Sequence, residues 1–332
     1  MKILHITNAF PYENAPAYGI FVKEQIEQLK QGDASIMHDV FFINGKKEGK
    51  KAYWNAIFQL RRQIKSYDLI HCHHVYSAFI ALLVKPRKQK MITSFLSSGF
   101  FDASKIPFWI SNRLYRWVLR NTDAKIFKDK IPDFALQDLS FHYLPNGVDT
   151  SFFSPMPMSE AKQKLNLAHD KKYLLFVSAN DLHRKEKRYD LFQEIVKKLK
   201  EQYQHEDIEE LHLVNAKRQE VPLYFNASHI HILTSDYEGS PNSVKEALSC
   251  NVAVVSTSVG NVVKMLEDIP NCYVSAKQDS QTMAELAHKC LKTQEEILNI
   301  DIRSHIFTKK LDNQSIIKQL IQLYYQLYNH SK

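Results

Sequence analysis

Cysteine, glycine and long apolar runs are all scarce in this sequence. The chain has four cysteines in 332 residues, and no two are spaced in the CxxC pattern of zinc or redox sites. The longest apolar run is Val75–Val84, which is too short to cross a bilayer of about 30 Å. Zinc-finger spacing, RNA-binding signatures and low-complexity tracts are absent as well. These absences argue against membrane-spanning, disulfide-stapled and nucleic-acid-binding proteins.

The N-terminal segment MKILHITNAFPY predicts a first β-strand and not a signal peptide, because Asn8 and Pro11 interrupt the apolar stretch. Most of the cysteines fall inside apolar or helical patterns, which suits buried thiols in a reducing compartment. We therefore expect a cytoplasmic protein. The four cysteines are Cys72, Cys250, Cys272 and Cys290.

Positive charge is in excess, with a formal net charge of +8. A basic surface suits nucleic acid, anionic lipid or a phosphorylated substrate, and it is also often merely solvated. Because no nucleic-acid motif accompanies the charge, we expect no nucleic-acid partner. The basic residues cluster toward the N-terminal half, at Lys46, Lys47, Lys50, Lys51, Arg61, Arg62, Lys65 and in the run 85–90.

Short apolar runs alternate with longer amphipathic stretches along the chain. The candidate strands of the first half are Lys2–Thr7, Val40–Asn44, Asp68–Cys72, Met91–Phe95, Ala124–Phe127 and Phe141–Leu144. Those of the second half are Tyr173–Ala179, Leu211–Asn215, His229–Thr234, Val252–Thr257 and Cys272–Ser275. Helical periodicity lies between them, as in Phe21–Gln31, Tyr189–Tyr203 and Thr282–Lys292. Apolar strands separated by helices predict parallel sheets covered on both faces.

The length exceeds what one hydrophobic core covers efficiently, so we expect two domains. We assign residues 1–150 to an N-terminal Rossmann-like domain and 151–314 to a C-terminal one. The boundary falls in 147–169, which contains Pro155 and Pro157. The apolar helix in the final segment, 315–332, is expected to pack back on the first domain.

Glycine occurs only eight times, so its placement is informative. Five glycines fall where a strand hands over to a loop or helix: Gly19, Gly99, Gly147, Gly239 and Gly260. In open α/β sheets these loops line the ligand crevice, and glycine there permits positive φ and close approach of the backbone. Ordinary turns are the alternative for any one of them.

The segment 234–250, TSDYEGSPNSVKEALSC, follows an apolar strand. Ser240 suits a helix N-cap and Pro241 the first helical position. The free amides at that helix end would then face the crevice and attract a phosphate. Asn242 and Glu246 share one helical face, and Glu238 precedes the turn. Carboxylates accept paired hydrogen bonds from vicinal diols, as in ribose and hexoses.

Glu238 and Glu246 match the E-x7-E motif of retaining glycosyltransferases of family 4 (group 1), and the segment resembles that family's donor site. The resemblance implies two Rossmann-like domains facing one another across a cleft, the GT-B fold, with residues 1–150 binding the acceptor and 151–314 the donor. It also implies that Glu246 holds the nucleotide's ribose and that Glu238 contacts the donor sugar. An exposed, functionless Glu246 is the alternative. The intervening residues would line the donor, namely Gly239, Ser240, Pro241, Asn242 and Ser243.

A second resemblance lies at 174–192, LLFVSANDLHRKEKRYDLF. In the family, an Arg and a Lys in this loop hold the donor diphosphate and stabilise charge on the departing nucleotide. Arg184 and Lys187 are the best candidates here, with Arg188 as a further donor-binding residue. The glycine that the family loop usually contains is missing. Residues 144–155 resemble the interdomain signature.

The resemblance is weaker in the first domain. Gly19 stands where the family's first βα-loop faces the diphosphate and acceptor, although adjacent glycines are the usual form. The strand end DLIHCHH, residues 68–74, would place His73 in the cleft, and a satisfied structural histidine is the alternative. In 92–102 many members carry a His-Gly pair, whereas this chain has Leu96. Ser97, Ser98 and Gly99 are then the remaining candidates for the sugar contact.

We therefore predict a retaining, metal-independent glycosyltransferase without a cofactor. Its donor would be a nucleotide sugar, most simply UDP-linked, carrying a hexose or N-acetylhexosamine. The acceptor would be a glycan or a polyprenyl-diphosphate-linked saccharide in surface polysaccharide synthesis, of capsule or lipopolysaccharide. A catalytically silent nucleotide-sugar-binding partner and a GT-B-fold epimerase are the alternatives.

The stretch Lys105–Arg120 mixes aromatics with arginines. It suits peripheral contact with the anionic inner face of the cell membrane. A core-facing helix with a basic outer face fits the same pattern.

Overall fold

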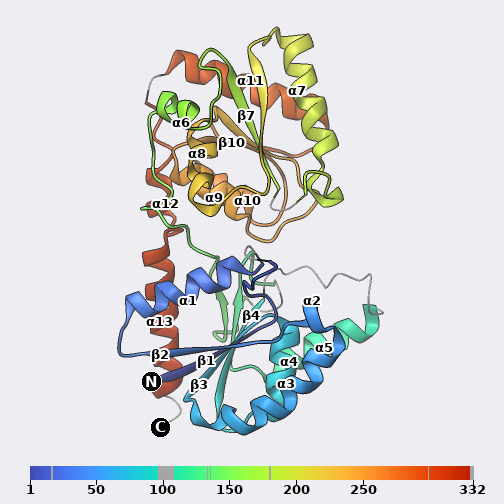
Figure 1. The fold of residues 1–332 in the computed structure, drawn as a ribbon, viewed down its shortest axis with the longest axis vertical. Helices are drawn as coiled ribbons and strands as arrows, with labels where there is room; N and C mark the ends of the chain where they lie inside the picture. The colour runs from blue at the N-terminus through green and yellow to red at the C-terminus, as the bar shows by residue number, and fades with distance from the viewer. Residues whose placement is uncertain are drawn as a thin grey trace. The chain divides into compact units, whose positions relative to one another are not determined.

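A computed structural model describes residues 1–15, 18–95, 108–132, 134, 136–178, 181–297 and 299–329. The chain divides into two compact units. Unit 1 comprises Met1–Asn146 and Gln314–Lys332, and unit 2 comprises Gly147–Asn313. Each unit contains one parallel β-sheet with helices on both faces (Figure 1). The predicted α/β class with two Rossmann-like sheets is therefore confirmed.

The sheet of unit 1 has six parallel strands in the order β2-β1-β3-β4-β5-β6. Its strands are β1 (Lys2–Thr7), β2 (Met37–Phe42), β3 (Leu69–His73), β4 (Lys90–Phe95), β5 (Ala124–Phe127) and β6 (Phe141–Tyr143). The strand β2 begins three residues before the predicted Val40, at Met37. Polar residues in the first half of β2 obscured its start in the sequence. An edge strand tolerates such residues because one of its edges pairs with no neighbouring strand.

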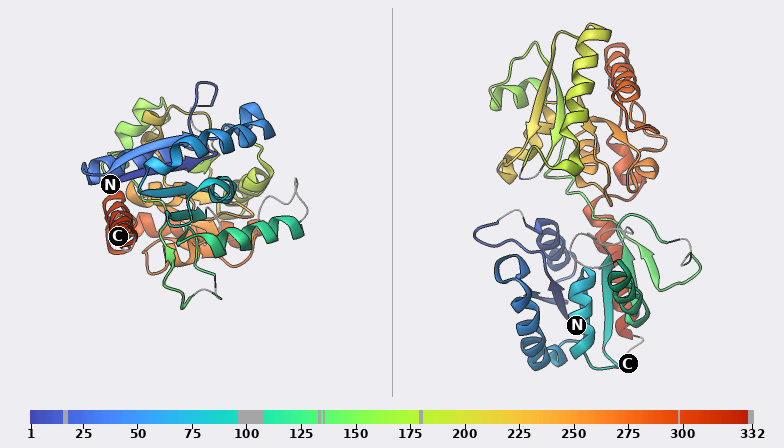
Figure 2. Two further views of the ribbon diagram at one scale, coloured as in Figure 1. Left: turned by 90° about the horizontal axis from the view of Figure 1, so that it is seen from below. Right: turned by 90° about the vertical axis from the view of Figure 1, so that its right-hand side faces the viewer.

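Helices cover the sheet of unit 1 on both faces, as Figures 1 and 2 show. One core cluster joins the sheet to α3 (Lys50–Gln63), α4 (Val75–Val84) and α5 (Phe108–Asn121). The other joins it to α1 (Ile20–Gly32) and α13 (Asn313–Asn329). The short helix α2 (Gly45–Glu48) precedes α3. The chain's last helix thus completes the core of the unit that its first strand begins, because Leu320 and Tyr324 are fully buried there.

The helix α5 packs on the core with a basic outer face. Tyr115 and Val118 are buried, whereas Arg113, Arg116 and Arg120 are exposed. Of the two interpretations of Lys105–Arg120, the described part fits the core-facing helix. In the described part of the chain, no helix is both long and apolar enough to cross a membrane.

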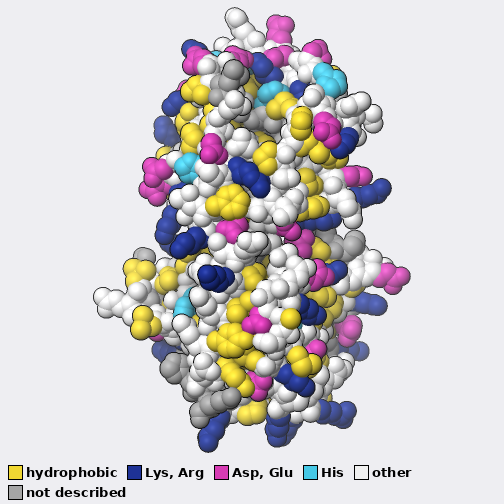
Figure 3. All heavy atoms as spheres, turned by 90° about the vertical axis from the view of Figure 1, so that its left-hand side faces the viewer, with side chains coloured by type: hydrophobic (Ala, Val, Ile, Leu, Met, Phe, Trp, Pro, Cys, Tyr) yellow, Lys and Arg dark blue, Asp and Glu magenta, His cyan; other side chains and the backbone are white. Residues whose placement is uncertain are grey.

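Basic side chains do not gather into one surface on the face shown in Figure 3. Among the described residues there, Lys and Arg lie scattered between acidic, hydrophobic and uncharged side chains in both units. A groove that follows a nucleic-acid backbone would require a continuous basic stripe. That face therefore gives no support to nucleic-acid binding.

Four histidines lie together in the interior of unit 1. His5 Nδ1 is 2.9 Å from His73 Nε2, and His5 Nε2 is 2.9 Å from His38 Nδ1. His71 hydrogen-bonds to Tyr324 Oη at 2.7 Å. Burial lowers the pKa of His38 to about 4 and of His73 to about 3, and it also lowers the pKa of His5 and His71. All four rings are therefore neutral in the folded protein at pH 7.

Acid should destabilise unit 1 through these histidines. The unfolded chain takes up their protons below pH 6.5, while the folded chain resists until about pH 4, so unfolding binds protons in that window. The free energy of unfolding should fall by up to about 1.4 kcal/mol per pH unit for each histidine. Urea unfolding at pH 7, 6 and 5 measures this. His73→Asn should flatten the profile, and the same change at exposed His169 should not. A midpoint that is constant with pH in the wild type would contradict the assignment.

The sheet of unit 2 has five parallel strands in the order β11-β10-β9-β7-β8. They are β7 (Lys172–Val177), β8 (Ile208–Leu213), β9 (Ile230–Leu233), β10 (Ala253–Thr257) and β11 (Tyr273–Ser275). The edge strand β8 begins before the predicted Leu211, because Glu209 and Glu210 masked its start. The helices α7 (Tyr189–Tyr203) and α11 (Ser280–Glu296) pack together on this sheet. The remaining helices are α6 (Met158–Lys164), α8 (Val221–Asn226), α9 (Asn242–Ser249), α10 (Val262–Leu266) and α12 (Ser304–Thr308).

The strand order determines where a ligand fits in unit 2. From β7 the chain passes to β8 on one side of it, and then to β9 on the other. The loops that follow β7 and β9 therefore diverge at the carboxyl edge of the sheet, which is where open α/β sheets bind ligands. These are the loops that carry the basic cluster and the E-x7-E motif.

Candidate functional site

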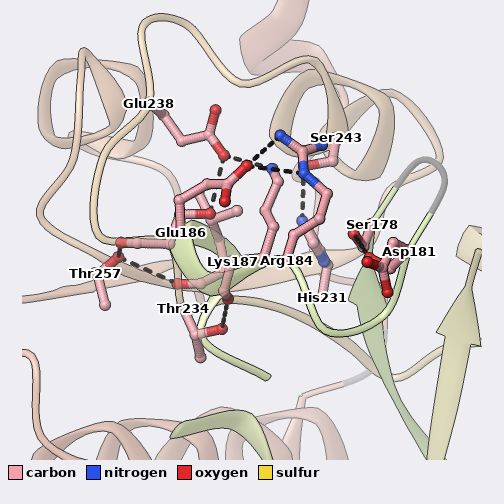
Figure 4. A network of polar contacts seen from close by, with 12 residues as sticks. Ser178, Asp181, Arg184, Glu186, Lys187, His231, Thr234, Glu238, Ser243 and Thr257 are labelled. Atoms are coloured by element: carbon pink, nitrogen blue, oxygen red, sulfur yellow. Dashed lines mark hydrogen bonds and ion pairs between the residues drawn. The ribbon is translucent and has the colours of Figure 1, made fainter. Parts of the chain in front are cut away.

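The two motif-bearing loops of unit 2 are joined by hydrogen bonds (Figure 4). The loop after β7 contains the 3₁₀ turn η3 (Lys185–Lys187). Thr234 Oγ1, just after β9, donates to the carbonyl oxygen of Lys187 at 2.7 Å. The amide of Asp236 donates to the carbonyl oxygen of Glu186 at 2.9 Å. These backbone contacts fix the basic loop against the segment that carries Glu238.

Lys187 and Glu238 form an ion pair at the centre of this arrangement. Lys187 Nζ lies 2.5 Å from Glu238 Oε1, and the two side chains are only 17% and 19% exposed. Ser235 Oγ donates to the same carboxylate oxygen at 2.9 Å. Two residues predicted to be catalytic, which are 51 positions apart, therefore touch.

The guanidinium of Arg184 contacts a carboxylate that sequence reasoning missed. Its Nε donates to Glu186 Oε1 at 2.8 Å, and Nη2 contacts the same oxygen. Hydrogen bonding by its own backbone amide, together with Arg184, lowers the pKa of the Glu186 carboxyl. Glu186 is therefore ionised and offsets positive charge in the loop expected to hold a diphosphate. The only signal in the sequence was one acidic residue inside a basic run.

Arg188 links the start of α7 to the loop after β9 through hydrogen bonds. Its guanidinium makes two hydrogen bonds of 2.9–3.0 Å to Asp190 Oδ2 and another to Asp236 at 3.1 Å. The hydrogen bond to Asp190 raises the pKa of Arg188, with Asp236 contributing. In this structure the residue thus joins two acidic side chains, and its predicted contact with the donor would require these pairs to open.

The prediction that Ser240 caps α9 is wrong. The helix comprises Asn242–Ser249, and Pro241 occupies the N-cap position with extended backbone. The Ser240 hydroxyl instead accepts hydrogen bonds from the fully buried Lys245 and from Asn261, both at 3.2 Å. Among the described residues no side chain caps α9. Its first amides are therefore left for another acceptor.

Two further side chains mark the start of α9. Asn242 Oδ1 is buried and has no hydrogen-bond partner among the described residues. His231 Nδ1 lies 3.1 Å from the Leu175 carbonyl, which can only accept, so Nδ1 carries the proton. Burial lowers the pKa of His231 to about 4. The ring is therefore neutral, and its Nε2 accepts from Ser243 Oγ at 3.0 Å, which orients Ser243.

Glu246 pairs with Arg218, which no sequence motif predicted. Arg218 Nη1 lies 3.3 Å from Glu246 Oε1, whose side chain is 13% exposed. The guanidinium also lies over the rings of Phe153 and Phe152, at 5.0 and 5.3 Å from their centroids. Arg218 opens the 3₁₀ turn η4 (Arg218–Glu220), which lies 28 residues before Glu246. That separation carries no recognisable spacing, so only the fold brings the pair together.

Gly260 supports the Glu238–Gly239 turn by close packing. Its φ is +51°, and an added Cβ would lie 2.0 Å from the Gly239 carbonyl oxygen and 2.7 Å from that of Glu238. The next amide, of Asn261, donates to the Gly239 carbonyl at 3.1 Å. The glycine predicted at this strand end is therefore required by direct contact with the motif.

Gly260→Ala should displace the Glu238–Gly239 turn, because backbone atoms cannot move aside cheaply. We expect a loss of about 2 kcal/mol or more in stability and a clear weakening of nucleotide binding. Gly49→Ala is the matched control, since Gly49 also has positive φ, +66°, but has open space around it. Thermal midpoints and UDP titrations of both variants measure the difference. Equal UDP affinity in the Gly260 and Gly49 variants would contradict the contact's role.

The predicted residues of unit 1 fall into two groups. Ser97, Ser98 and Gly99, together with Leu96, lie outside the described residues. Gly19 has φ +67°, and a Cβ there would lie 2.2 Å from the backbone of Ala9, so the glycine brings the loop after β1 close to α1.

His73 lies in the interior of unit 1. Its ring is buried, hydrogen-bonded to His5 and stacked on His71 at 4.2 Å between centroids. The position favours the structural alternative, because the side chain of His73 lies on the same sheet face as its buried histidine neighbours.

A comparison with protein families matches one part of the chain. Residues 171–293, most of unit 2, match the family model described as Glycosyl transferases group 1. Over these residues the site-bearing unit is similar to the group 1 glycosyltransferases, a class of enzymes. The resemblance seen in the sequence is confirmed. No curated protein sequence matches the chain.

Solved structures share the fold along the whole chain. A sucrose-phosphate synthase from Thermosynechococcus elongatus superposes with a TM-score of 0.75 at 15% identity, covering 99% of this chain and 100% of that one. HepE from Anabaena, solved with UDP, has a TM-score of 0.72 at 13% identity and coverages of 98% and 100%. An E. coli structure bound with UDP-2-fluoro glucose has a TM-score of 0.71 at 11% identity, with 99% of each chain covered. At these identities the likeness establishes the GT-B fold alone.

Proposed function

We propose that this enzyme transfers a sugar from a UDP-linked donor to a glycan or lipid-linked saccharide, with retention of anomeric configuration. The observation that carries the proposal is the meeting of Lys187 and Glu238 beside the uncapped end of α9, at the switch point of a family-matched unit. Positive charge, a carboxylate and free helix amides are the groups that a diphosphate sugar requires.

The donor's nucleoside is assigned to Glu246. A carboxylate accepts two hydrogen bonds from the vicinal hydroxyls of ribose, and Glu246 is largely shielded from water. Arg218 lies against the same carboxylate and on two aromatic rings, so it is placed to contact the nucleoside as well. Uracil is the proposed base, since the UDP complexes of HepE share this fold.

The diphosphate is assigned to the start of α9 and to the loop after β7. Uncapped amides and the positive end of the helix dipole favour an anion there. Arg184 and Lys187 are ion-paired with Glu186 and Glu238 in this structure, so an incoming diphosphate competes with two carboxylates. As it displaces them, Glu238 becomes available to the sugar hydroxyls. Asn242 Oδ1, buried without a partner among the described residues, is a second acceptor for a donor hydroxyl.

The chemical step is a same-face displacement driven by stabilisation of the leaving UDP. Lys187 and Arg184 neutralise the negative charge that develops on the diphosphate as its bond to the anomeric carbon breaks. The acceptor hydroxyl then forms the new bond to the anomeric carbon on the same face of the sugar, and its proton passes to the departing diphosphate oxygen. The expected acceptors are glycans or polyprenyl-diphosphate-linked saccharides of capsule or lipopolysaccharide synthesis. We infer no cofactor and no metal requirement.

Release of UDP from a panel of UDP-hexoses and UDP-N-acetylhexosamines, with and without saccharide acceptors, tests the proposal. Acceptor-dependent UDP release is the expected result. Nucleotide binding without turnover would point to a silent binding partner. Conversion of the donor sugar without acceptor and without UDP release would point to an epimerase. Either of these results would overturn the transferase assignment.

A further inference from the structure

The helix α3 exposes its largest apolar side chains. Trp54 and Phe58, one turn apart on the same stripe, are 67% and 65% exposed. The opposite stripe buries the smaller Ala52 and Ala56 together with Leu60. Size and burial are thus inverted relative to an ordinary surface helix, whose outer face is polar. Two adjacent exposed aromatic rings indicate an interaction surface.

Unpaired positive charge surrounds the two rings. Lys51 lies one turn before Trp54, and Arg61 and Arg62 lie one turn after Phe58, all on the exposed side of α3. Glu48 is the only acidic residue from 45 to 66. Within the described part of the chain, the basic residues of this segment form no ion pair. They comprise Lys46, Lys47, Lys50, Lys51, Arg61, Arg62 and Lys65.

Charge decides between the two partners that such a surface suits. A second copy of the chain docked symmetrically through α3 would place Lys51 of each copy near Arg61 and Arg62 of the other, and like charges in contact oppose association. An anionic lipid surface attracts each of these side chains, while Trp and Phe rings favour the depth of the lipid headgroups. The helix is held by its buried stripe, so its outer face is already ordered for binding.

We propose that α3 docks the protein on an anionic membrane surface, with Trp54 and Phe58 inserted at headgroup level and Lys51, Arg61 and Arg62 against lipid phosphates. The inference rests on the proposed function in one respect: membrane docking would bring the enzyme to its proposed lipid-linked acceptors. It also assigns the membrane contact to α3 and not to Lys105–Arg120, where the sequence led us to expect it. In the described part of that stretch, Tyr115 and Val118 are buried in the core.

Flotation of the full chain with lipid vesicles tests the proposal. We expect binding to phosphatidylcholine vesicles with about one-third phosphatidylglycerol, weak binding to phosphatidylcholine alone, and release by high salt. Trp54→Ser/Phe58→Ser should lower the partition coefficient about tenfold or more by loss of apolar insertion. Arg61→Gln/Arg62→Gln should lower it by at least about tenfold through lost charge.

Matched controls separate this surface from a general effect. Phe307→Ser removes a 48% exposed aromatic ring from unit 2. Lys197→Gln/Lys292→Gln removes two charges from exposed side chains of the same unit. Neither should change vesicle binding. Equal binding by all variants, or no binding by the wild type, would overturn the proposal. Self-association abolished by Trp54→Ser/Phe58→Ser, without vesicle binding, would overturn it in favour of a dimer.

UDP titration of the same preparations keeps the two proposals apart. The α3 variants should bind UDP as the wild type does, because α3 belongs to unit 1 and the donor residues to unit 2. Vesicle binding lost with UDP binding intact removes only the membrane inference. Vesicle binding intact in a protein that binds no UDP removes only the donor site.

Discussion

Glu246→Ala is expected to lower the affinity for UDP at least about a hundredfold, since two hydrogen bonds to a charged acceptor each contribute about 1.5–3 kcal/mol. The carboxylate is mostly shielded from water, so water cannot readily replace those bonds. Isothermal titration of UDP measures the loss. Glu246→Gln keeps the shape of the side chain but loses the charge and one acceptor. Its affinity for UDP should lie between those of Glu246→Ala and the wild type.

Two controls guard the interpretation of that loss. Glu296→Ala removes an exposed carboxylate from the same unit and should leave UDP affinity unchanged. Arg218→Met/Glu246→Ala removes both members of the pair, so a defect caused only by taking the Glu246 carboxylate away from Arg218 would be relieved in it. Wild-type affinity in Glu246→Ala, or recovery of affinity in the double variant, would contradict a direct contact between Glu246 and the nucleotide.

Lys187→Met should lower kcat about 10²–10³-fold, the size of effect seen when one group that stabilises transition-state charge is removed. The donor's KM should change much less, because the charge on the leaving diphosphate develops fully only as the bond breaks. Steady-state UDP release at saturating acceptor measures both constants.

The neighbouring Lys185 provides the control for Lys187. It lies in the same 3₁₀ turn, but its side chain is exposed. Lys185→Met should therefore retain nearly full kcat, while Lys187→Arg should retain more activity than Lys187→Met. Equal kcat in Lys187→Met and Lys185→Met would show that Lys187, with its ion pair to Glu238, does not lie at the bond of the donor that breaks.

The sequence was sufficient to predict the parts of the site that depend on local pattern. Buried strands such as Lys2–Thr7 and Ala124–Phe127 are short and rich in apolar residues, and their bounds agree with the structure. The helix Tyr189–Tyr203 likewise has a full amphipathic repeat. The E-x7-E spacing, together with the strand and the glycine loop that follow it, carried the resemblance to the family, because this pattern lies within one short segment of the sequence.

Pairings made by the fold were beyond prediction from the sequence. Arg218 reaches Glu246 from a different βα-loop, and Glu186 differs from its basic neighbours only once the loop is folded. The start of α9 was misplaced because Pro241 adopts extended backbone, while the Ser240 hydroxyl is taken by Lys245. The inverted outer face of α3 is likewise visible only when burial is known, since its periodicity alone fits either face.

Titration of UDP into the wild-type protein, with GDP and ADP alongside, tests the central claim most directly. We predict saturable one-to-one binding of UDP, stronger than that of the other two nucleotides, with a matching rise in thermal midpoint. If none of the three nucleotides binds or stabilises the protein, then the loops after β7 and β9 do not form a nucleotide-sugar site, and the proposed reaction is wrong.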